Sequence, residues 1–112
     1  GNEDNIIEDV TFENCSIELT KTSKWQCGLY DLRPCLDYGV ESHDNSAFFI
    51  RYAKDISIRK TKTRWGNLCD SYSYAIDAAN VENLNLSEFD GKSAKENLDD
   101  IKIDHVKLNY QK

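Results

Sequence analysis

The chain has 112 residues, of which 39% are hydrophobic, 11% aromatic and 30% charged, a composition typical of one globular domain spanning residues 1–112. The 20 acidic and 14 basic residues give a net charge of -6, which disfavours binding to the phosphate backbone of nucleic acid. No apolar run approaches the roughly 20 residues that a membrane-spanning helix needs, so we expect no membrane span.

Four stretches of the chain share one pattern: residues 7–15, 53–61, 81–89 and 98–106. Each contains an apolar or small residue, two polar residues ending in Asp or Asn, an aliphatic–polar–apolar triplet, and two more polar residues. The triplet alternates with period two, as in a half-buried strand, and the Asp or Asn before it favours a bend. Short strands that recur between bends indicate a β-solenoid.

The repeats predict which apolar side chains stack on one another. The anchor positions are 46, 28 and 17 residues apart, so we expect coils of about 20 to 30 residues and a trimmed final coil. A preceding strand recurs at matching offsets, with Phe48 and Ile50 before Ile56 and with Ile76 and Ala78 before Leu84. The two predicted inward rows are Val10, Ile56, Leu84 and Ile101, and Phe12, Ile58, Leu86 and Ile103.

This pattern predicts an all-β fold, namely a right-handed parallel β-helix of about four coils, its hand set by the preference of parallel crossovers. Residues 19–47 and 64–73 do not fit the repeat, and we expect them to form long loop excursions. The alternative fold is an antiparallel β-sandwich of the carbohydrate-binding kind, because short strands at regular spacing suit both.

The four cysteines allow three pairings in an oxidising compartment. Cys27 and Cys35 flank a loop-like stretch and could pair across it, whereas Cys15 occupies an apolar position of the repeat, and the sequence leaves the disulfide state of the four cysteines open. No Cys-x-x-Cys motif is present and only two histidines accompany the cysteines, so we expect no metal site. No glycine-rich phosphate loop is present, and we expect no cofactor.

The paired segments AFFIRYAKDISIRK (residues 47–60) and YAIDAANVENLNL (residues 74–86) resemble the C-terminal coils of polygalacturonase-type glycoside hydrolases. Residues 6–18 are similar to the coil that precedes the long late loop of these enzymes. The resemblance covers about residues 5–108, and its strand pattern belongs to the wider pectate-lyase-like superfamily of right-handed parallel β-helices. It implies a secreted or periplasmic protein that acts on uronic-acid-rich polysaccharide.

The catalytic segments of that family are not matched here. Its Asn-Thr-Asp, Gly-His-Gly and Arg-Ile-Lys segments are missing, and Asp99-Asp100 aligns with a bend of the repeat. We therefore expect no catalytic residue and no hydrolase activity in this chain. The predicted role is the non-catalytic C-terminal part of a longer polysaccharide-degrading hydrolase, and the alternative is a stand-alone carbohydrate-binding or structural β-repeat module.

Aromatic side chains in the two excursions are the candidate carbohydrate contacts. Aromatic rings stack on the C–H faces of sugars, and an arginine can bind a uronate carboxylate through two hydrogen bonds. The competing interpretation is that these rings pack the excursions against the strands. The candidates are Trp25, Tyr30, Tyr38, Trp65, Tyr72 and Arg64.

The first predicted coil is poorly covered. Five residues precede Ile6 and Ile7, too few to cover a coil's cross-section, and uncovered strand edges tend to pair with other chains. We expect self-association into a dimer or larger assembly through this coil, where upstream coils of a longer protein would otherwise lie.

Overall fold

The computed structural model describes residues 1–31, 33 and 39–111, and in them the chain forms seven strands and no helix. The predicted all-β content is therefore confirmed. The strands are β1 (Ile7–Glu13), β2 (Ser16–Leu19), β3 (Leu29–Asp31), β4 (Val40–Ser42), β5 (Phe48–Trp65), β6 (Ile76–Asp90) and β7 (Ile101–Gln111).

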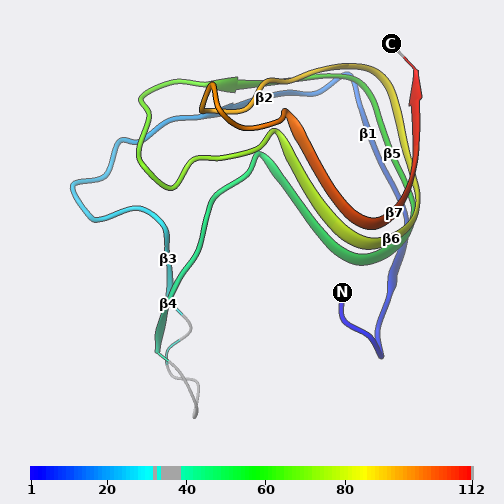
Figure 1. Cartoon of the computed structure of the whole chain (residues 1–112), viewed down its shortest axis with the longest axis horizontal. Coiled ribbons are helices and arrows are strands. Elements are labelled where there is room, and N and C mark those ends of the chain that lie inside the picture. The colour runs from blue at the N-terminus through cyan, green and yellow to red at the C-terminus, as the bar shows by residue number, and fades with distance from the viewer. Residues whose placement is uncertain (32, 34–38, 112) are drawn as a thin grey trace.

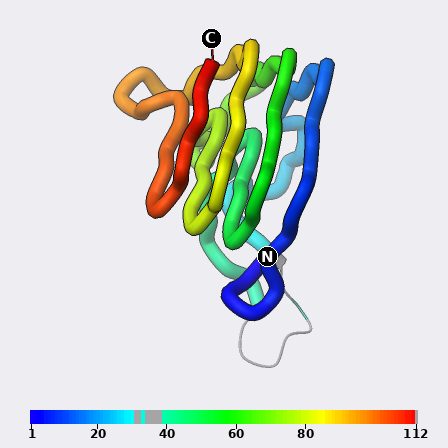
Figure 2. Tube along the Cα trace, turned by 90° about the vertical axis from the view of Figure 1, so that its right-hand side faces the viewer, coloured from blue at the N-terminus to red at the C-terminus, as the bar shows by residue number. Residues whose placement is uncertain are grey.

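Five strands form one parallel sheet of order β1-β5-β6-β7, in which β2 pairs with the later part of β5. The other two strands, β3 and β4, form a separate antiparallel pair. The long strands lie behind one another and bend together in Figure 1, and β1 and β7 lie at opposite edges of the sheet in Figure 2. All pairs within the main sheet are parallel, which excludes the antiparallel sandwich.

The strands bend at equivalent positions, where the backbone has positive φ. Asparagine and aspartate adopt this conformation more readily than most residues because their short polar side chains can bond locally. The bends predicted at Asp9, Asp55 and Asn83 are confirmed, and the Asn83 amide donates to the Asp55 carboxylate at 3.0 Å. Residues with positive φ lie side by side on neighbouring strands in three columns, which are Tyr52, Asn80 and His105; Asp9, Asp55 and Asn83; and Asn14, Lys60 and Glu88.

Stacked apolar side chains fill the interior of the bent sheet. Ile58, Leu84 and Leu86 are almost completely buried, and burial of each such side chain contributes about 1.5–3 kcal/mol. The predicted rows are confirmed for β1, β5 and β6. The rows that the sheet contains are Val10, Ile56, Leu84 and Leu108, and Phe12, Ile58, Leu86 and Tyr110.

The last strand aligns differently from the prediction. Ile101 and Ile103 pair with Ile76 and Ala78. They do not extend the rows that contain Leu84 and Leu86. The period-two pattern of residues 101–103 recurs at residues 106–108, so the pattern did not distinguish the two alignments. The predicted final coil of 17 residues is therefore wrong.

The prediction of a right-handed parallel β-helix of about four coils is also wrong. It treated each bend as the end of a strand, whereas the backbone ladder continues through the bends and makes β5 and β6 single strands of 18 and 15 residues. The result is one bent parallel sheet in a globule of 37 × 35 × 25 Å. The expected excursion at 19–47 contains the β3–β4 pair, and the one expected at 64–73 begins within β5.

The bend at Lys60 tests whether positive φ at these positions favours asparagine. Lys60 has a φ of 48° and an exposed side chain, and Asn14 occupies the equivalent position after β1. Because asparagine tolerates this conformation better than lysine, we expect Lys60→Asn to raise the free energy of unfolding by about 0.5–1 kcal/mol in urea denaturation. The control is Lys62→Asn in the extended part of β5, where asparagine is a poor strand former. A Lys60→Asn protein no more stable than this control would contradict the account.

Candidate functional site

Three irregular parts of the chain meet at one end of the sheet. The Asn45 amide donates to the carbonyl of Ser71 at 2.7 Å, and the Ser73 amide donates to the carbonyl of Asn45 at 2.9 Å. The Lys21 amide likewise donates to the carbonyl of Asn67 at 2.9 Å. Residues 20–28, 43–47 and 66–75 are thereby joined into one group of loops.

A disulfide between Cys27 and Cys69 links these loops covalently. Cys27 therefore does not form the possible pair with Cys35, which lies outside the described residues. The two bonded cysteines are 42 residues apart, and they meet because the loops that carry them are hydrogen-bonded to each other. Cys15 is a free, half-buried thiol.

Gly28 allows the loops to approach closely. It has a φ of 82°, and an added Cβ would lie 2.7 Å from the Cβ of Ser71 and 3.2 Å from the carbonyl oxygen of His43. A larger residue would therefore be strained both in its backbone and in its contacts. The carbonyl of Gly28 accepts from the His43 amide at 2.6 Å, which holds the end of β4 beside the disulfide.

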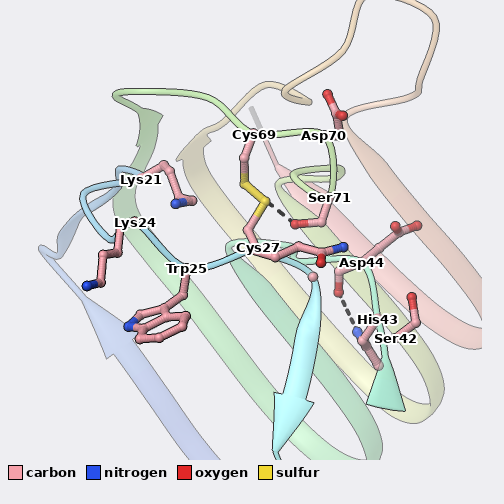
Figure 3. A pocket seen from close by; sticks show the side chains of 12 residues that line it. Lys21, Lys24, Trp25, Cys27, Ser42, His43, Asp44, Cys69, Asp70 and Ser71 are labelled. Carbon is pink, nitrogen blue, oxygen red and sulfur yellow. Dashed lines mark hydrogen bonds between the residues drawn. A yellow bond between two sulfur atoms is a disulfide. The ribbon is translucent and has the colours of Figure 1, made fainter. Parts of the chain in front are cut away.

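A pocket of about 530 Å³ opens next to this disulfide (Figure 3). Lys21, Lys24 and Trp25 lie on one side of it, and Asp44 and Asp70 lie on the other. The Trp25 side chain is 72% exposed, with the Lys24 Nζ 5.2 Å from its ring centroid. The pocket therefore presents an open aromatic face, two cations and two carboxylates.

His43 lines the same pocket but is held by packing. Its ring stacks on Tyr30 with centroids 4.3 Å apart and meets the Phe49 ring edge-on at 4.9 Å. Its Nδ1 donates to the backbone carbonyl of Asp44 in the tautomer that carries the proton there. A catalytic histidine is oriented toward a nucleophile, usually by a carboxylate, and this arrangement supplies neither.

The predicted carbohydrate contacts are only partly brought together. Trp25 lines the pocket, and Tyr30 stacks behind it on the His43 ring as a half-buried side chain. Tyr38 lies outside the described residues.

The other three predicted contacts do not line this pocket. Trp65 and Tyr72 pack on each other with centroids 5.0 Å apart, and the Trp65 indole donates to the carbonyl of Lys92 at 2.8 Å. This contact supports the packing interpretation for both rings. Arg64 lines a separate hollow of about 320 Å³ beside two lysines of β5.

The sequence interpretation missed the charged residues of the pocket. Lys21, Lys24 and Asp70 were not candidates, although Lys21-Thr-Ser-Lys-Trp25 places two cations within four residues of an aromatic side chain. That run was the available signal for Lys21 and Lys24. No sequence signal marks Asp70, because it reaches the pocket only through the pairing of loops at the end of the sheet.

Comparison with protein-family models, with curated proteins and with solved structures gives no match. Within residues 1–31, 33 and 39–111, no helix is long and apolar enough to cross a membrane. The same residues contain no group of three or more His, Cys, Asp or Glu side chains that could hold a metal ion.

Proposed function

We propose that the chain binds an acidic oligosaccharide, of the uronic-acid type, in the pocket beside the Cys27–Cys69 disulfide. The observation that carries this proposal is the exposure of Trp25 at 72%, next to Lys21 and Lys24. Indole rings usually bury most of their surface, so an open one beside cations favours a ligand with both an apolar face and a negative charge.

Each group of the pocket has a role in this binding. The C–H face of a sugar ring stacks on Trp25, while the ammonium groups of Lys21 and Lys24 donate to a uronate carboxylate. Asp44 and Asp70 accept hydrogen bonds from sugar hydroxyls. A volume of about 530 Å³ is within the range of small-ligand sites.

Local cations are needed because the chain as a whole repels anions. The net charge is -6, but salt screens charges beyond about 8–10 Å, so the field at the pocket is set by its own groups, with Lys21 and Lys24 on one side and Asp44 and Asp70 on the other. The lysine side is the one that favours a carboxylate. The disulfide favours an oxidising compartment, which supports a secreted or periplasmic location. We place this binding role in a non-catalytic part of a polysaccharide-degrading hydrolase, or in a stand-alone binding module.

Titration of the full chain with oligogalacturonate tests the proposal. In a Trp65→Phe background Trp25 is the sole tryptophan, so its fluorescence reports on contact with the sugar. We expect saturable binding that shifts this emission, and a calorimetric affinity about tenfold lower in Trp25→Ala.

The charge contribution is tested separately. Lys21→Gln and Lys24→Gln should each weaken binding of the acidic ligand, while binding of its methyl-esterified, neutral form should change little. Lys95→Gln, an exposed lysine that does not line the pocket, is the matched control. Equal affinity in Trp25→Ala and the parent, or no binding at millimolar ligand, would overturn the proposal.

A further inference from the structure

The main sheet has two open edges. In the described part of the chain, β1 pairs only with β5 and β7 pairs only with β6. Alternate backbone amide and carbonyl groups along both edges are therefore unpaired within the sheet, and such edges are templates for pairing with another strand. Figure 2 shows the two edges on opposite sides of the molecule.

Both edges expose the ends of the apolar rows. On the β1 side Ile7 is 52% exposed and Phe12 37%, and an apolar hollow of about 260 Å³ lies beside them. On the β7 side Ile103 is 44% exposed and Tyr110 39%. Each edge thus presents apolar side chains that a further strand would cover.

The charges of the strands alternate in sign across the sheet. β1 and β2 carry only acidic charges, β5 carries six basic residues and one acidic residue, β6 carries four acidic residues and no basic one, and β7 carries two lysines and one aspartate. The alternation is also seen in single pairs. Glu8 pairs with Lys54, and Lys54 pairs with Glu82 on its other side.

At the β7 edge Val106 pairs with Val81 and Leu108 with Leu84, so Lys107 lies opposite the two residues Glu82 and Asn83 of a bulge in β6. Lys54, Glu82 and Lys107 line one shallow hollow of about 370 Å³. The column therefore reads acid, base, acid, base from β1 to β7. The next strand that would match it carries an acid at this position, and Glu8 of β1 meets that requirement.

We propose that the β7 edge of one copy pairs in parallel with the β1 edge of a second copy and continues the register of the sheet. Val106, Leu108 and Tyr110 then extend their rows. Lys107 lies opposite Glu8 and Asp9 of the next copy, as it lies opposite Glu82 and Asn83 within its own sheet. The side chains that they meet in the second copy are those of Ile7, Val10 and Phe12.

This contact joins two different edges, so it is heterologous and does not close on itself. Repetition produces open rows of copies rather than a symmetric dimer. The pairing stretch lies on the right-hand limb in Figure 1, which holds β1 and the end of β7. The loop that precedes β7 lies to the left of this limb in Figure 1 and projects beyond the β7 edge in Figure 2.

Charge reversal tests the contact in the full chain. Sedimentation of the parent protein should show oligomers that grow with concentration and weaken with salt. Lys107→Glu places acidic side chains opposite each other at the junction, and Glu8→Lys places two lysine side chains opposite each other. We expect each change to raise the dissociation constant of the junction about tenfold.

Mixing the two variants provides the decisive measurement. Every junction between unlike copies is then again acid against base, so the mixture should form larger oligomers than either variant alone. Loss of stability within each copy is not repaired by mixing, so this recovery reports on the junction itself. Lys95→Glu and Glu96→Lys, which change the net charge equally on an exposed loop, should associate as the parent does.

Three outcomes would overturn the proposal. One is a parent protein that stays monomeric at high micromolar concentration. Another is a dimer of fixed size that neither reversal affects, because it would indicate a symmetric contact elsewhere. The third is a mixture of the two variants that sediments as the separate variants do.

Discussion

Leu84→Ala should lower the free energy of unfolding by about 3–5 kcal/mol, the upper part of the range for a buried leucine. Leu84 is completely buried and lies in register between Ile56 on β5 and Leu108 on β7. The backbones of both neighbouring strands are held by ladder hydrogen bonds, so the cavity left by the missing atoms cannot collapse. Denaturation in guanidinium chloride, followed by circular dichroism, measures the change.

Leu68→Ala is the matched control for this substitution. Leu68 lies on a loop and is 58% exposed, so its truncation should change stability by less than about 0.5 kcal/mol. Similar losses in the two variants would show that the row containing Leu84 is not the centre of the core.

Replacing both Cys27 and Cys69 with serine should lower the free energy of unfolding by about 3 kcal/mol. The bond closes a loop with a sequence separation of 42 residues, and its removal frees the unfolded chain to adopt many more conformations. Ligand binding should weaken as well, because Lys21, Lys24 and Trp25 lie on the loop of Cys27 and Asp70 lies on the loop of Cys69. The measurement is the denaturation midpoint, together with oligogalacturonate affinity.

A reducing agent distinguishes the disulfide from other effects of the substitutions. The parent protein should lose a similar amount of stability on reduction, whereas the double variant should not respond. Cys15→Ser removes the thiol that is free in the described part of the chain and should leave the response to reduction intact. A parent protein insensitive to reduction would contradict the assigned bond.

The strand pattern identified most of the sheet register. The offset that places Phe48 beside Ile76 and Ile56 beside Leu84 follows from the repeat, because apolar side chains alternate with period two and recur after each bend. The same pattern misplaced Ile101, since two triplets in β7 satisfy it equally. It also divided the sheet into coils, because a bend with positive φ resembles a strand end in sequence although the ladder passes through it.

The site was less predictable than the sheet. Trp25 was a candidate as an aromatic residue in a loop, but its neighbours in space depend on the pairing of two loops that are far apart in sequence. Neither the Cys27–Cys69 bond nor the approach of Asp70 has a local signal. The contact at Gly28 that brings the loops together depends on a backbone angle and a close approach that composition does not reveal.

The alternating strand charges also bear on how the chain avoids misfolding. A folding intermediate that placed β1 next to β6 would bring two acidic strands together, and one that placed β5 next to β7 would oppose basic residues. Like charges directly opposite each other cost about 0.2–1 kcal/mol per pair, so several such pairs select against the wrong neighbour. This alternation of charge separates correct from incorrect strand order within one molecule, and it leaves the outermost strands β1 and β7 with charges of opposite sign. Charge alone, however, does not distinguish a strand of the same chain from the equivalent strand of a neighbouring copy.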